Sequence, residues 1–251
     1  GYAVSAPRRQ GAVLAPIVGL GLATLLATFS RGAWIGLAGG AGAMLLLRLA
    51  ARRRPAVRAR AALPAALALA ALVLGFAGSN WDLLQPRLGL TNPSAEVRSL
   101  EERGALLAVA GDLIARRPWL GVGMGNFAAA AYALAPERLA AYGVYQPVHN
   151  VALLAAAELG VAGAALWLAL ILGPLVALWR RRRRLCLTPW LAGLTAALVA
   201  LSLVALADYY PWFSHQGRLL LYVVLALWAG AWTRAGEDAR DPRRDRRPVV
   251  L

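Results

Sequence analysis

The sequence predicts an all-α fold, a polytopic bundle of about six transmembrane helices with one large extracytoplasmic loop that contains an amphipathic helix. The first observation is composition, since 60% of the 251 residues are apolar and the mean hydropathy is +0.57. Soluble domains usually run nearer to about 45–50% apolar, so this excess indicates lipid as the solvent. The other two observations are a set of long apolar windows and the one-sided distribution of the 27 basic residues, all of them arginine.

The apolar windows define the expected spans. A helix needs about 20 apolar residues to cross roughly 30 Å of hydrocarbon. Six windows meet this requirement: residues 11–29, 33–50, 62–79, 150–178, 187–207 and 217–233. Pro64 and Pro189 fall near the ends of the third and fifth windows, where proline is tolerated. The long loop 80–149 separates the third and fourth windows, and the polar tail 234–251 is expected to be disordered.

The arginines set the expected orientation, because cytoplasmic loops collect positive charge. Nineteen arginines and only four acids lie on one side of the six-span arrangement, in four groups: Arg8 and Arg9, residues 48–60, residues 180–184 and residues 234–251. This side carries the whole net charge of +15, whereas loop 80–149 holds six arginines and six acids. We therefore expect the N- and C-termini in the cytoplasm and loop 80–149 outside.

Composition and charge also exclude several classes of protein. The single cysteine, Cys186, rules out a disulfide framework and a cysteine-based zinc site, and two histidines leave little room for a metal centre. We therefore expect no metal and no cofactor. The basic runs abut span ends without interleaved aromatic residues, which is typical of topogenic and lipid contacts and argues against nucleic-acid binding. The first window is too long for a signal peptide, and Arg31 follows it without a cleavage site.

Arg31 is the first unusual residue of the outer side. It lies in a very short turn between the first two spans, with Trp34 as an expected interface anchor. One interpretation is a snorkelling charge at a helix end. The other is a functional group, because an arginine between two apolar spans usually has an anionic partner.

Arg103 lies in the helical stretch of the outer loop, about 95–115. The apolar residues of this stretch fall near one stripe: Val97, Leu100, Leu107, Leu113 and Ile114. This pattern predicts an amphipathic helix on the membrane surface. Glu101 and Glu102 are close to Arg103, so a solvated, salt-bridged face is the alternative to a functional arginine.

A glycine-rich segment follows this helix. After Arg117, glycines at the alternate positions 121, 123 and 125 predict a tight turn with a close backbone approach. The segment lacks the GxGxxG spacing and follows a helix instead of a strand, which argues against a nucleotide-binding loop. A plain turn is the favoured interpretation, and a phosphate cradle formed by its amides is the alternative.

His149 and Asn150 lead directly into the fourth span, which places the histidine at its outer mouth. Glu158 falls nine residues further on, about 13 Å deeper at helical rise. A carboxylate inside a span is costly and normally faces a partner or a cavity. A packing link to a neighbouring helix is the favoured interpretation of Glu158, and a site residue is the alternative. For His149, an interfacial position without chemistry and a catalytic role carry equal weight.

The last outer turn, residues 208–218, is aromatic and suits an interfacial belt. Asp208 and His215 are the ionisable residues in it that could line a site. An interfacial lid is the favoured interpretation.

Several of these pieces, in this order, carry a resemblance: Ser30 to Trp34, Arg103, Arg117 to Phe127, His149 with Asn150, and Glu158 to Gly160. Together they resemble the O-antigen ligase superfamily, which includes Wzy-type polysaccharide polymerases and some protein O-oligosaccharyltransferases. The resemblance covers roughly residues 25–175, and the turn from Asp208 to Gly217 is also similar to that of some members. Members of the family carry more than six spans and Gly1 is not a methionine, so we expect a truncated chain or a short member.

The resemblance implies a membrane glycosyltransferase of cell-surface polysaccharide biosynthesis. It would move a glycan from undecaprenyl pyrophosphate to an acceptor hydroxyl at the outer face of the bacterial cytoplasmic (inner) membrane. Arg31 and Arg103 would bind the diphosphate through bidentate contacts, and His149 would act as the general base or as a further donor. No outer Asp-x-Asp pair exists, so a metal-independent reaction is expected. The second-choice substrate-binding residues are Arg117, Asn150, Glu158, Asp208 and His215.

The implied partners are the undecaprenyl-pyrophosphate-linked glycan donor, membrane lipids, and an acceptor. A polymerase would use a second lipid-linked glycan as its acceptor, whereas a ligase would use lipid A core or a protein, and the residues leave both open. Direct displacement would invert the anomeric centre. An alternative from another class is a permease or flippase component for an anionic or lipid-linked solute. Paired broken helices and an inverted repeat would favour that class, and neither is visible in the sequence.

Overall fold

The structure, a computed structural model, describes residues 8–50, 71, 73–87, 90–91, 93–142, 146–181 and 187–240. Every regular element within those ranges is a helix, which confirms the predicted all-α class. In chain order the helices are α2 (Arg8–Ala27), α3 (Arg31–Ala50), α5 (Trp81–Arg87), α6 (Pro93–Arg116), α7 (Phe127–Leu134), α8 (Pro136–Ala140), α9 (Val151–Arg181), α10 (Pro189–Ala207), α11 (Tyr210–Phe213) and α12 (His215–Arg240).

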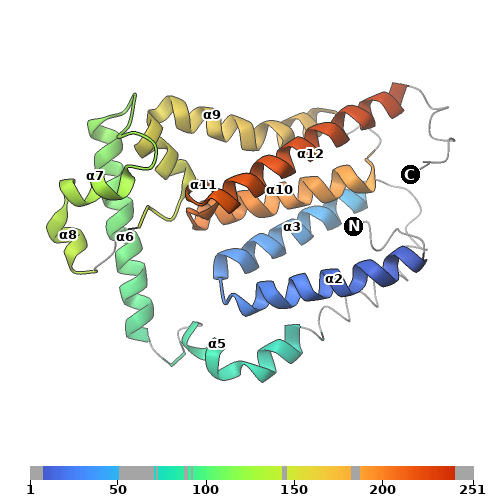
Figure 1. Cartoon of the computed structure of the whole chain (residues 1–251), viewed down its shortest axis with the longest axis horizontal. Coiled ribbons are helices and arrows are strands. Elements are labelled where there is room, and N and C mark those ends of the chain that lie inside the picture. The colour runs from blue at the N-terminus through green and yellow to red at the C-terminus, as the bar shows by residue number, and fades with distance from the viewer. Residues whose placement is uncertain are drawn as a thin grey trace.

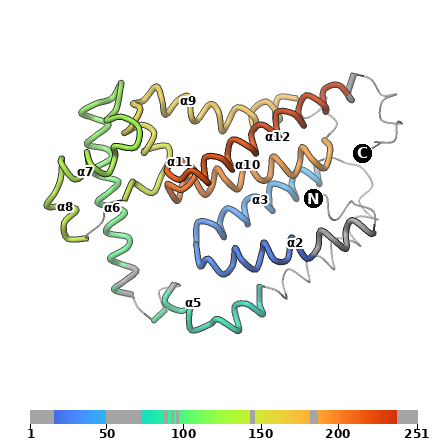
Figure 2. The backbone as a smooth tube through the Cα atoms, in the orientation of Figure 1, coloured from blue at the N-terminus to red at the C-terminus, as the bar shows by residue number. Residues whose placement is uncertain are grey.

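The long helices form one bundle. α3 packs most extensively along α10, and α10 also contacts α9 and α12. α2 and α3 form a hairpin that turns at residues 28–30, as the backbone trace in Figure 2 shows. α6 packs against α9 across one end of the bundle, with α7 and α8 beside it (Figure 1). This end, which we call the loop end, therefore holds most of the described part of the predicted outer loop.

Four helices within the described residues are long and apolar enough to cross a membrane: Arg31–Leu49, Val151–Arg181, Pro189–Ala207 and His215–Glu237. They agree with four of the six predicted spans, and the chain is an all-α polytopic membrane protein. The first predicted span corresponds to α2, where the apolar stretch is the shorter Pro16–Ala27. The third, 62–79, lies mostly outside the described residues. Six spans therefore remain a prediction.

Two details of the helices differ from the sequence expectations. α12 continues to Arg240, so the tail predicted to be disordered from residue 234 begins as a helix, while 241–251 lie outside the described residues. The helix that covers the predicted span 150–178 has a break, because Gly160 has φ 75° and ψ 179°. These angles are extended and of positive φ, a region that glycine alone adopts readily. α9 is thus two helical segments joined at Gly160.

Small residues bring α3 and α10 close together. A Cβ added at Gly36 would lie 2.7 Å from Cγ2 of Val204, and one at Gly40 would lie 2.9 Å from the carbonyl oxygen of Ala196. Glycines four residues apart share one helix face, so the backbones can approach where larger side chains would hold them apart. This packing fixes the start of α3 beside the end of α10.

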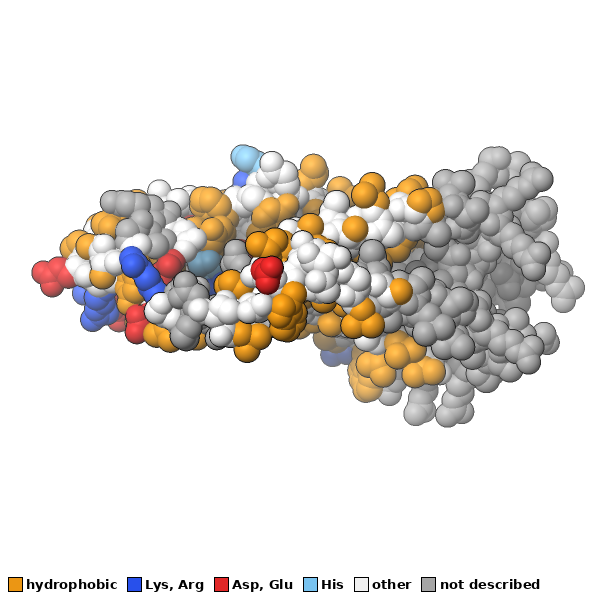
Figure 3. Space-filling view, turned by 90° about the horizontal axis from the view of Figure 1, so that it is seen from below, with side chains coloured by type: hydrophobic (Ala, Val, Ile, Leu, Met, Phe, Trp, Pro, Cys, Tyr) orange, Lys and Arg blue, Asp and Glu red, His pale blue; other side chains and the backbone are white. Residues whose placement is uncertain are grey.

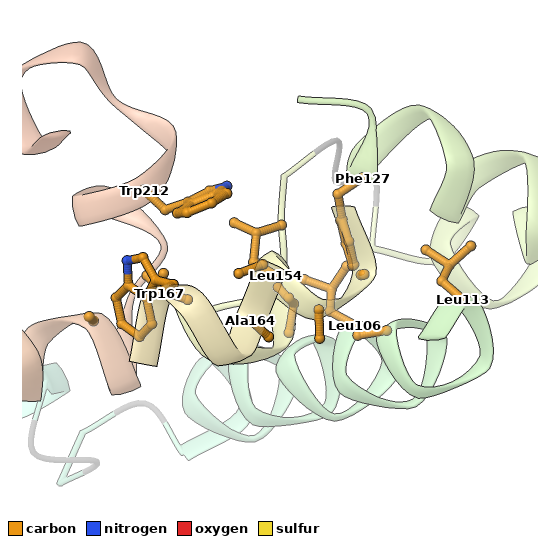
Figure 4. Packing of buried hydrophobic residues seen from close by; sticks show 14 of the residues in the cluster. Leu106, Leu113, Phe127, Leu154, Ala164, Trp167 and Trp212 are labelled. Carbon is orange, nitrogen blue, oxygen red and sulfur yellow. The ribbon is translucent and has the colours of Figure 1, made fainter. Parts of the chain in front are cut away.

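The face by which α6 packs on the rest of the protein differs from the apolar stripe predicted to lie on the membrane surface. Its buried residues are apolar and share one side: Leu106, Val109, Ala110 and Leu113. Three members of the predicted stripe, Val97, Leu100 and Leu107, are exposed. α9 and α7 supply the surface on which the buried residues of α6 pack. Leu113 is the residue of the predicted stripe that is also buried in this contact. Figure 4 shows Leu106 and Leu113 of α6 with Phe127 of α7 and Leu154 of α9 in this core.

Charged side chains are unevenly distributed. In the space-filling view of Figure 3, most of the visible acids and arginines gather at the loop end, while hydrophobic side chains dominate the described surface of the bundle. Such a division is expected for a protein whose bundle faces lipid and whose loop end faces water.

Candidate active site

Three chain segments meet at the loop end of the bundle, where α3 begins, α10 ends and α9 begins. A Cβ added at Gly32, the second residue of α3, would lie 3.7 Å from Cβ of Ala207, the last residue of α10. Nδ2 of Asn150 donates to the carbonyl oxygen of Leu206 at 3.3 Å. The segments that contain Arg31, His149 and Asp208, far apart in the sequence, therefore lie in one region of the structure.

His149 lies in this region just before α9. Its ring is partly buried and packs edge-on against the ring of Tyr209, with 5.0 Å between the ring centroids. Nδ1 of His149 is buried and has no hydrogen-bond partner. The next residue, Asn150, accepts a hydrogen bond on Oδ1 from the amide of Leu153 at 3.1 Å and so caps the start of α9. The histidine is thus held at a fixed helix start.

Burial and charges of both signs act on the pKa of His149. Burial lowers the pKa of His149 below its ordinary value of 6.5, and the positive charge of Arg103 lowers it further. The carboxylates of Asp208 and Glu102 oppose this effect. A lowered pKa keeps the imidazole neutral at neutral pH, which is the form that accepts a proton. The structure therefore brings the predicted residues His149, Arg103 and Asp208 into one electrostatic environment.

Polar residues that the sequence did not single out complete this environment. The hydroxyl of Tyr209 donates to Oε1 of Gln146 at 3.2 Å, and Nε2 of Gln146 donates to Oε1 of Glu102. Burial raises the pKa of Tyr209, and Asp208 and Glu102 raise it further, so its hydroxyl keeps its proton. Gln146 lies three residues before His149, and this closeness in the sequence could have identified it as a candidate site residue. The contact between Gln146 and Tyr209 joins residues 63 positions apart, and no sequence pattern predicts it.

Arg31 and Arg103 lie on different helices. Arg31 is exposed in the first turn of α3, one residue before Gly32, where an added Cβ would reach Ala207. Arg103 is partly buried on α6, and its charge acts on His149. Guanidinium groups on two separate helices can bind a diphosphate from two sides.

The other predicted residues have contacts of their own. Oδ1 of Asp208 accepts from the amide of Tyr210 at 3.1 Å and so holds the start of α11. Exposed His215 has its Nδ1 3.1 Å from Nη2 of Arg218, and exposed Arg117 accepts on its carbonyl oxygen from the amide of Gly121. The described contacts of His215 and Arg117 are thus with their own neighbours in sequence.

The glycine turn is tight, as predicted, and packs against the break in α9. Gly121, Gly123 and Gly125 all have positive φ, between 63° and 92°. The amides of Val122 and Gly123 donate to the carbonyl oxygens of Ala157 and Glu158, each at 2.9 Å. Two of the amides that a phosphate cradle would need are therefore used inside the protein, which favours the plain-turn interpretation.

Glu158 is a link between segments, the favoured interpretation of the sequence. Its side chain is 1% exposed. Oε2 accepts from the indole Nε1 of Trp212 at 2.9 Å, and Oε1 accepts from the backbone amide of Phe127 at 3.3 Å. Both oxygens thus face donors of the protein itself.

A separate hollow of about 360 Å³ lies on the other side of the loop end, between the end of α6 and α8. Its charged lining residues are Asp112, Arg116, Glu137 and Arg138, and Arg138 forms an exposed ion pair with Asp112 at 3.1 Å. Its opposite charges balance, so it offers no net attraction for an anionic donor. Within the described part of the chain, no group of three or more histidine, cysteine or acidic side chains is arranged to hold a metal ion.

Comparison with known proteins gives one finding. The O-antigen ligase family model matches residues 16–168, more than half of the chain. This range contains Arg31, Arg103, the glycine turn, His149 and Glu158. Comparisons with curated proteins and with solved structures gave no match. The chain belongs to the O-antigen ligase family.

Proposed function

We propose that the protein transfers a glycan from undecaprenyl pyrophosphate to an acceptor hydroxyl at the outer face of the bacterial cytoplasmic membrane. The observation that carries this proposal is the position of His149, neutralised by burial and by Arg103, at the loop end of a chain of the O-antigen ligase family. The membership supports a ligase- or polymerase-type glycosyltransferase. The site residues support the particular chemistry.

In this proposal His149 is the general base. The acceptor oxygen attacks the anomeric carbon of the donor sugar, the bond from that carbon to the diphosphate oxygen breaks, and His149 takes the hydroxyl proton. Arg31 and Arg103 bind the departing diphosphate and stabilise its developing charge, which removes the need for an acid. Positive charge is avoided on the outer side of a membrane, so an arginine such as Arg31, in a short turn between two apolar spans, fits an anionic substrate.

We propose metal independence for the same reason. The two guanidinium groups supply the positive charge that a diphosphate leaving group requires. Transfer by the purified protein should therefore continue in the presence of EDTA. Loss of transfer with EDTA, restored by Mg²⁺ or Mn²⁺, would contradict this part of the proposal.

The test uses the full-length gene, deleted in its host and complemented with wild type, Arg31→Ala, Arg103→Ala or His149→Ala. Arg98→Ala is the matched control, because Arg98 lies on the same helix as Arg103 and makes an exposed contact with the carbonyl oxygen of Ala141. Membrane levels are checked by blotting, and surface and lipid-linked glycans are separated on gels. We expect the three site variants to accumulate in the membrane and lose surface glycan, and the control to restore it.

The accumulated intermediate separates the two reaction types. Long polymer on the carrier lipid indicates a ligase, and single repeats indicate a polymerase. If all three stable site variants restore wild-type glycan, the assignment is wrong and a permease or flippase for a lipid-linked solute becomes the better hypothesis. The break in α9 is the feature that such a protein would use, but the glycine turn packs against it, and the amide of Val161 donates to the carbonyl oxygen of Pro118 at 2.7 Å.

A further inference from the structure

Glu158 has a role that the proposed reaction does not use. It is almost fully buried among apolar residues of α6, α7 and α9, where a carboxylate is costly unless its oxygens are paired. Both oxygens receive donors, one from Trp212 and one from the amide of Phe127. A packed hydrophobic residue could fill such a place at a lower cost. The two hydrogen bonds are therefore the feature that requires a carboxylate at this position.

The first contact leads from Glu158 to the proposed base. Trp212 belongs to α11, a helix of only four residues. The amides of Trp212 and Phe213 both donate to the carbonyl oxygen of Tyr209, at 3.0 and 2.9 Å. Tyr209 in turn packs its ring edge-on against His149. A hydrogen bond from Trp212 to Glu158 thus holds a short rigid turn whose other end contacts the histidine.

The second contact fixes Glu158 itself. Phe127 is the first residue of α7, and it follows the glycine turn that pairs with the break in α9. Gly160 lies two residues after Glu158, and a Cβ there would overlap the carbonyl oxygen of Trp119. The carboxylate therefore sits where three segments of the loop end meet. Figure 4 shows Trp212 and Phe127 on different sides of Leu154.

We propose that Glu158 is a positioning residue, which holds Trp212 and the start of α7 on one carboxylate and so fixes Tyr209 against His149. This inference rests on the proposed function of His149 as the base. It assigns Glu158 to the inside of the protein, where it orders the site without touching the substrate.

Two variants break the link in different ways. Glu158→Gln keeps the shape but leaves one acceptor oxygen for two donors, because an amide nitrogen donates and does not accept. Trp212→Phe removes the indole donor and leaves Glu158 with the amide of Phe127. If Glu158→Gln does not accumulate in the membrane, Trp212→Phe, which keeps the carboxylate, carries the test alone.

Trp228→Phe is the matched control. Nε1 of Trp228 donates to Oγ1 of Thr195 at 2.9 Å, and both residues are buried between α10 and α12. This is the same type of indole hydrogen bond, in the body of the bundle and about twelve residues of α10 away from Asp208. The control should lose stability without altering the site.

The readout is the titration of His149. The histidine signal that disappears in His149→Gln identifies that of His149 in NMR of ¹³C-labelled protein in lipid nanodiscs. The charged and titratable groups that face this histidine are Glu102 and Arg103 from α6 and Asp208 and Tyr209 beyond α10. Burial is the largest cause of the lowered pKa of His149, so release of Tyr209 should raise that pKa towards 6.5.

We expect Glu158→Gln and Trp212→Phe to raise the pKa of His149, and Trp228→Phe to leave it unchanged. Both linked variants should also lower kcat for glycan transfer by about tenfold or more with little change in KM, because a base that is misplaced by a fraction of an ångström loses efficiency without loss of donor binding. The double variant should lose little more than either single one, since both break the same link.

Failure of the positioning role and failure of the proposed function would give different results. If both variants fold with the thermal stability of the Trp228→Phe control and the titration of His149 does not move, the positioning role is wrong and the proposed function stands. If His149→Ala transfers glycan at the wild-type rate, the proposed function fails, and the inference that depends on it fails with it.

Discussion

The body of the bundle and its loop end are both closely packed, but by different means. Along α3 and α10 the backbones approach because Gly36 and Gly40 lack side chains, and the contacts are apolar. At the loop end the approach depends on irregular backbone, with positive φ at Gly121 and Gly160 and with hydrogen bonds between the turn and α9. Irregular backbone within an apolar span, such as the break at Gly160, is tolerated only where the protein itself satisfies the backbone polar groups.

The difference teaches where each region is vulnerable. Packing in the body of the bundle depends on side-chain volume, so an apolar residue of suitable size can serve at most of its positions. The loop end requires particular conformations and donors, because a buried amide or carboxylate without a partner costs far more than a lost apolar contact. A catalytic site built there inherits precise geometry from those requirements.

The largest effect should follow from Gly160→Ala. The substitution combines a positive φ with an overlap between the new Cβ and the carbonyl oxygen of Trp119, so the glycine turn cannot stay in place. We expect the free energy of unfolding to fall by about 3 kcal/mol or more and transfer to be lost. Thermal unfolding in detergent measures the first and glycan transfer the second. Gly173→Ala in the same helix, with open space around its Cβ, should be near neutral, and equal effects of the two would refute this reading of the break.

Gly40→Val tests the body of the bundle. Its Cβ would lie 2.9 Å from the carbonyl oxygen of Ala196, a backbone atom that cannot move aside. We expect a loss of about 1–3 kcal/mol in stability, with a smaller effect on transfer than that of Gly160→Ala. Gly42→Val, on an exposed face of α3 with nothing within 4 Å, is the control for helix propensity. An unfolding temperature that is the same for both variants would contradict the close packing of α3 on α10.

Asp208→Asn sharpens the electrostatic side of the comparison. The carboxylate of Asp208 raises the pKa of His149, so its removal should lower that pKa further. A general base works in its neutral form, and the acidic limb of the pH profile of kcat should therefore move to lower pH. Asparagine retains an Oδ1 that can accept from the amide of Tyr210, which limits structural change. A shift of the limb to higher pH would contradict the arrangement of charges around His149.

The smallest effect should come from Arg138→Ala. Its ion pair with Asp112 has side chains 61% and 51% exposed, and exposed pairs contribute less than about 1 kcal/mol. We expect stability within that range and an unchanged rate of transfer, measured by the same unfolding and transfer assays. A marked loss of transfer would assign the hollow beside α8 to substrate binding.

Much of this architecture could be predicted from the sequence. Apolar windows gave the all-α membrane class, and the alternate glycines gave the tight turn. The break at Gly160 could not be predicted, because a glycine inside an apolar run is common in spans and only the carbonyl oxygen of Trp119 shows why it must be glycine. The spacing of Leu100 and Leu107 predicted an apolar stripe, but which face of α6 packs on α9 could not be predicted, because that face depends on a partner far away in the sequence.

The contacts of the candidate site could be predicted only in part, for a similar reason. Charged residues in unfavourable places, such as Arg31 and Glu158, carry a local signal of function or linkage. Contacts between residues far apart in the sequence carry none. The approach of Tyr209 to His149 and the bond from Trp212 to Glu158 depend on how α11 is folded back, which no local pattern encodes.

The most direct test of the central claim is a comparison of binding and transfer in His149→Gln. Full-length protein in lipid nanodiscs would be given an undecaprenyl-pyrophosphate-linked glycan, with Arg103→Gln and Arg98→Gln alongside. We predict that His149→Gln binds the donor with near wild-type affinity and transfers glycan about 10²- to 10⁴-fold more slowly, as expected for loss of a general base. Arg103→Gln should lose donor affinity, and Arg98→Gln should match the wild type. Wild-type transfer by His149→Gln would contradict the account.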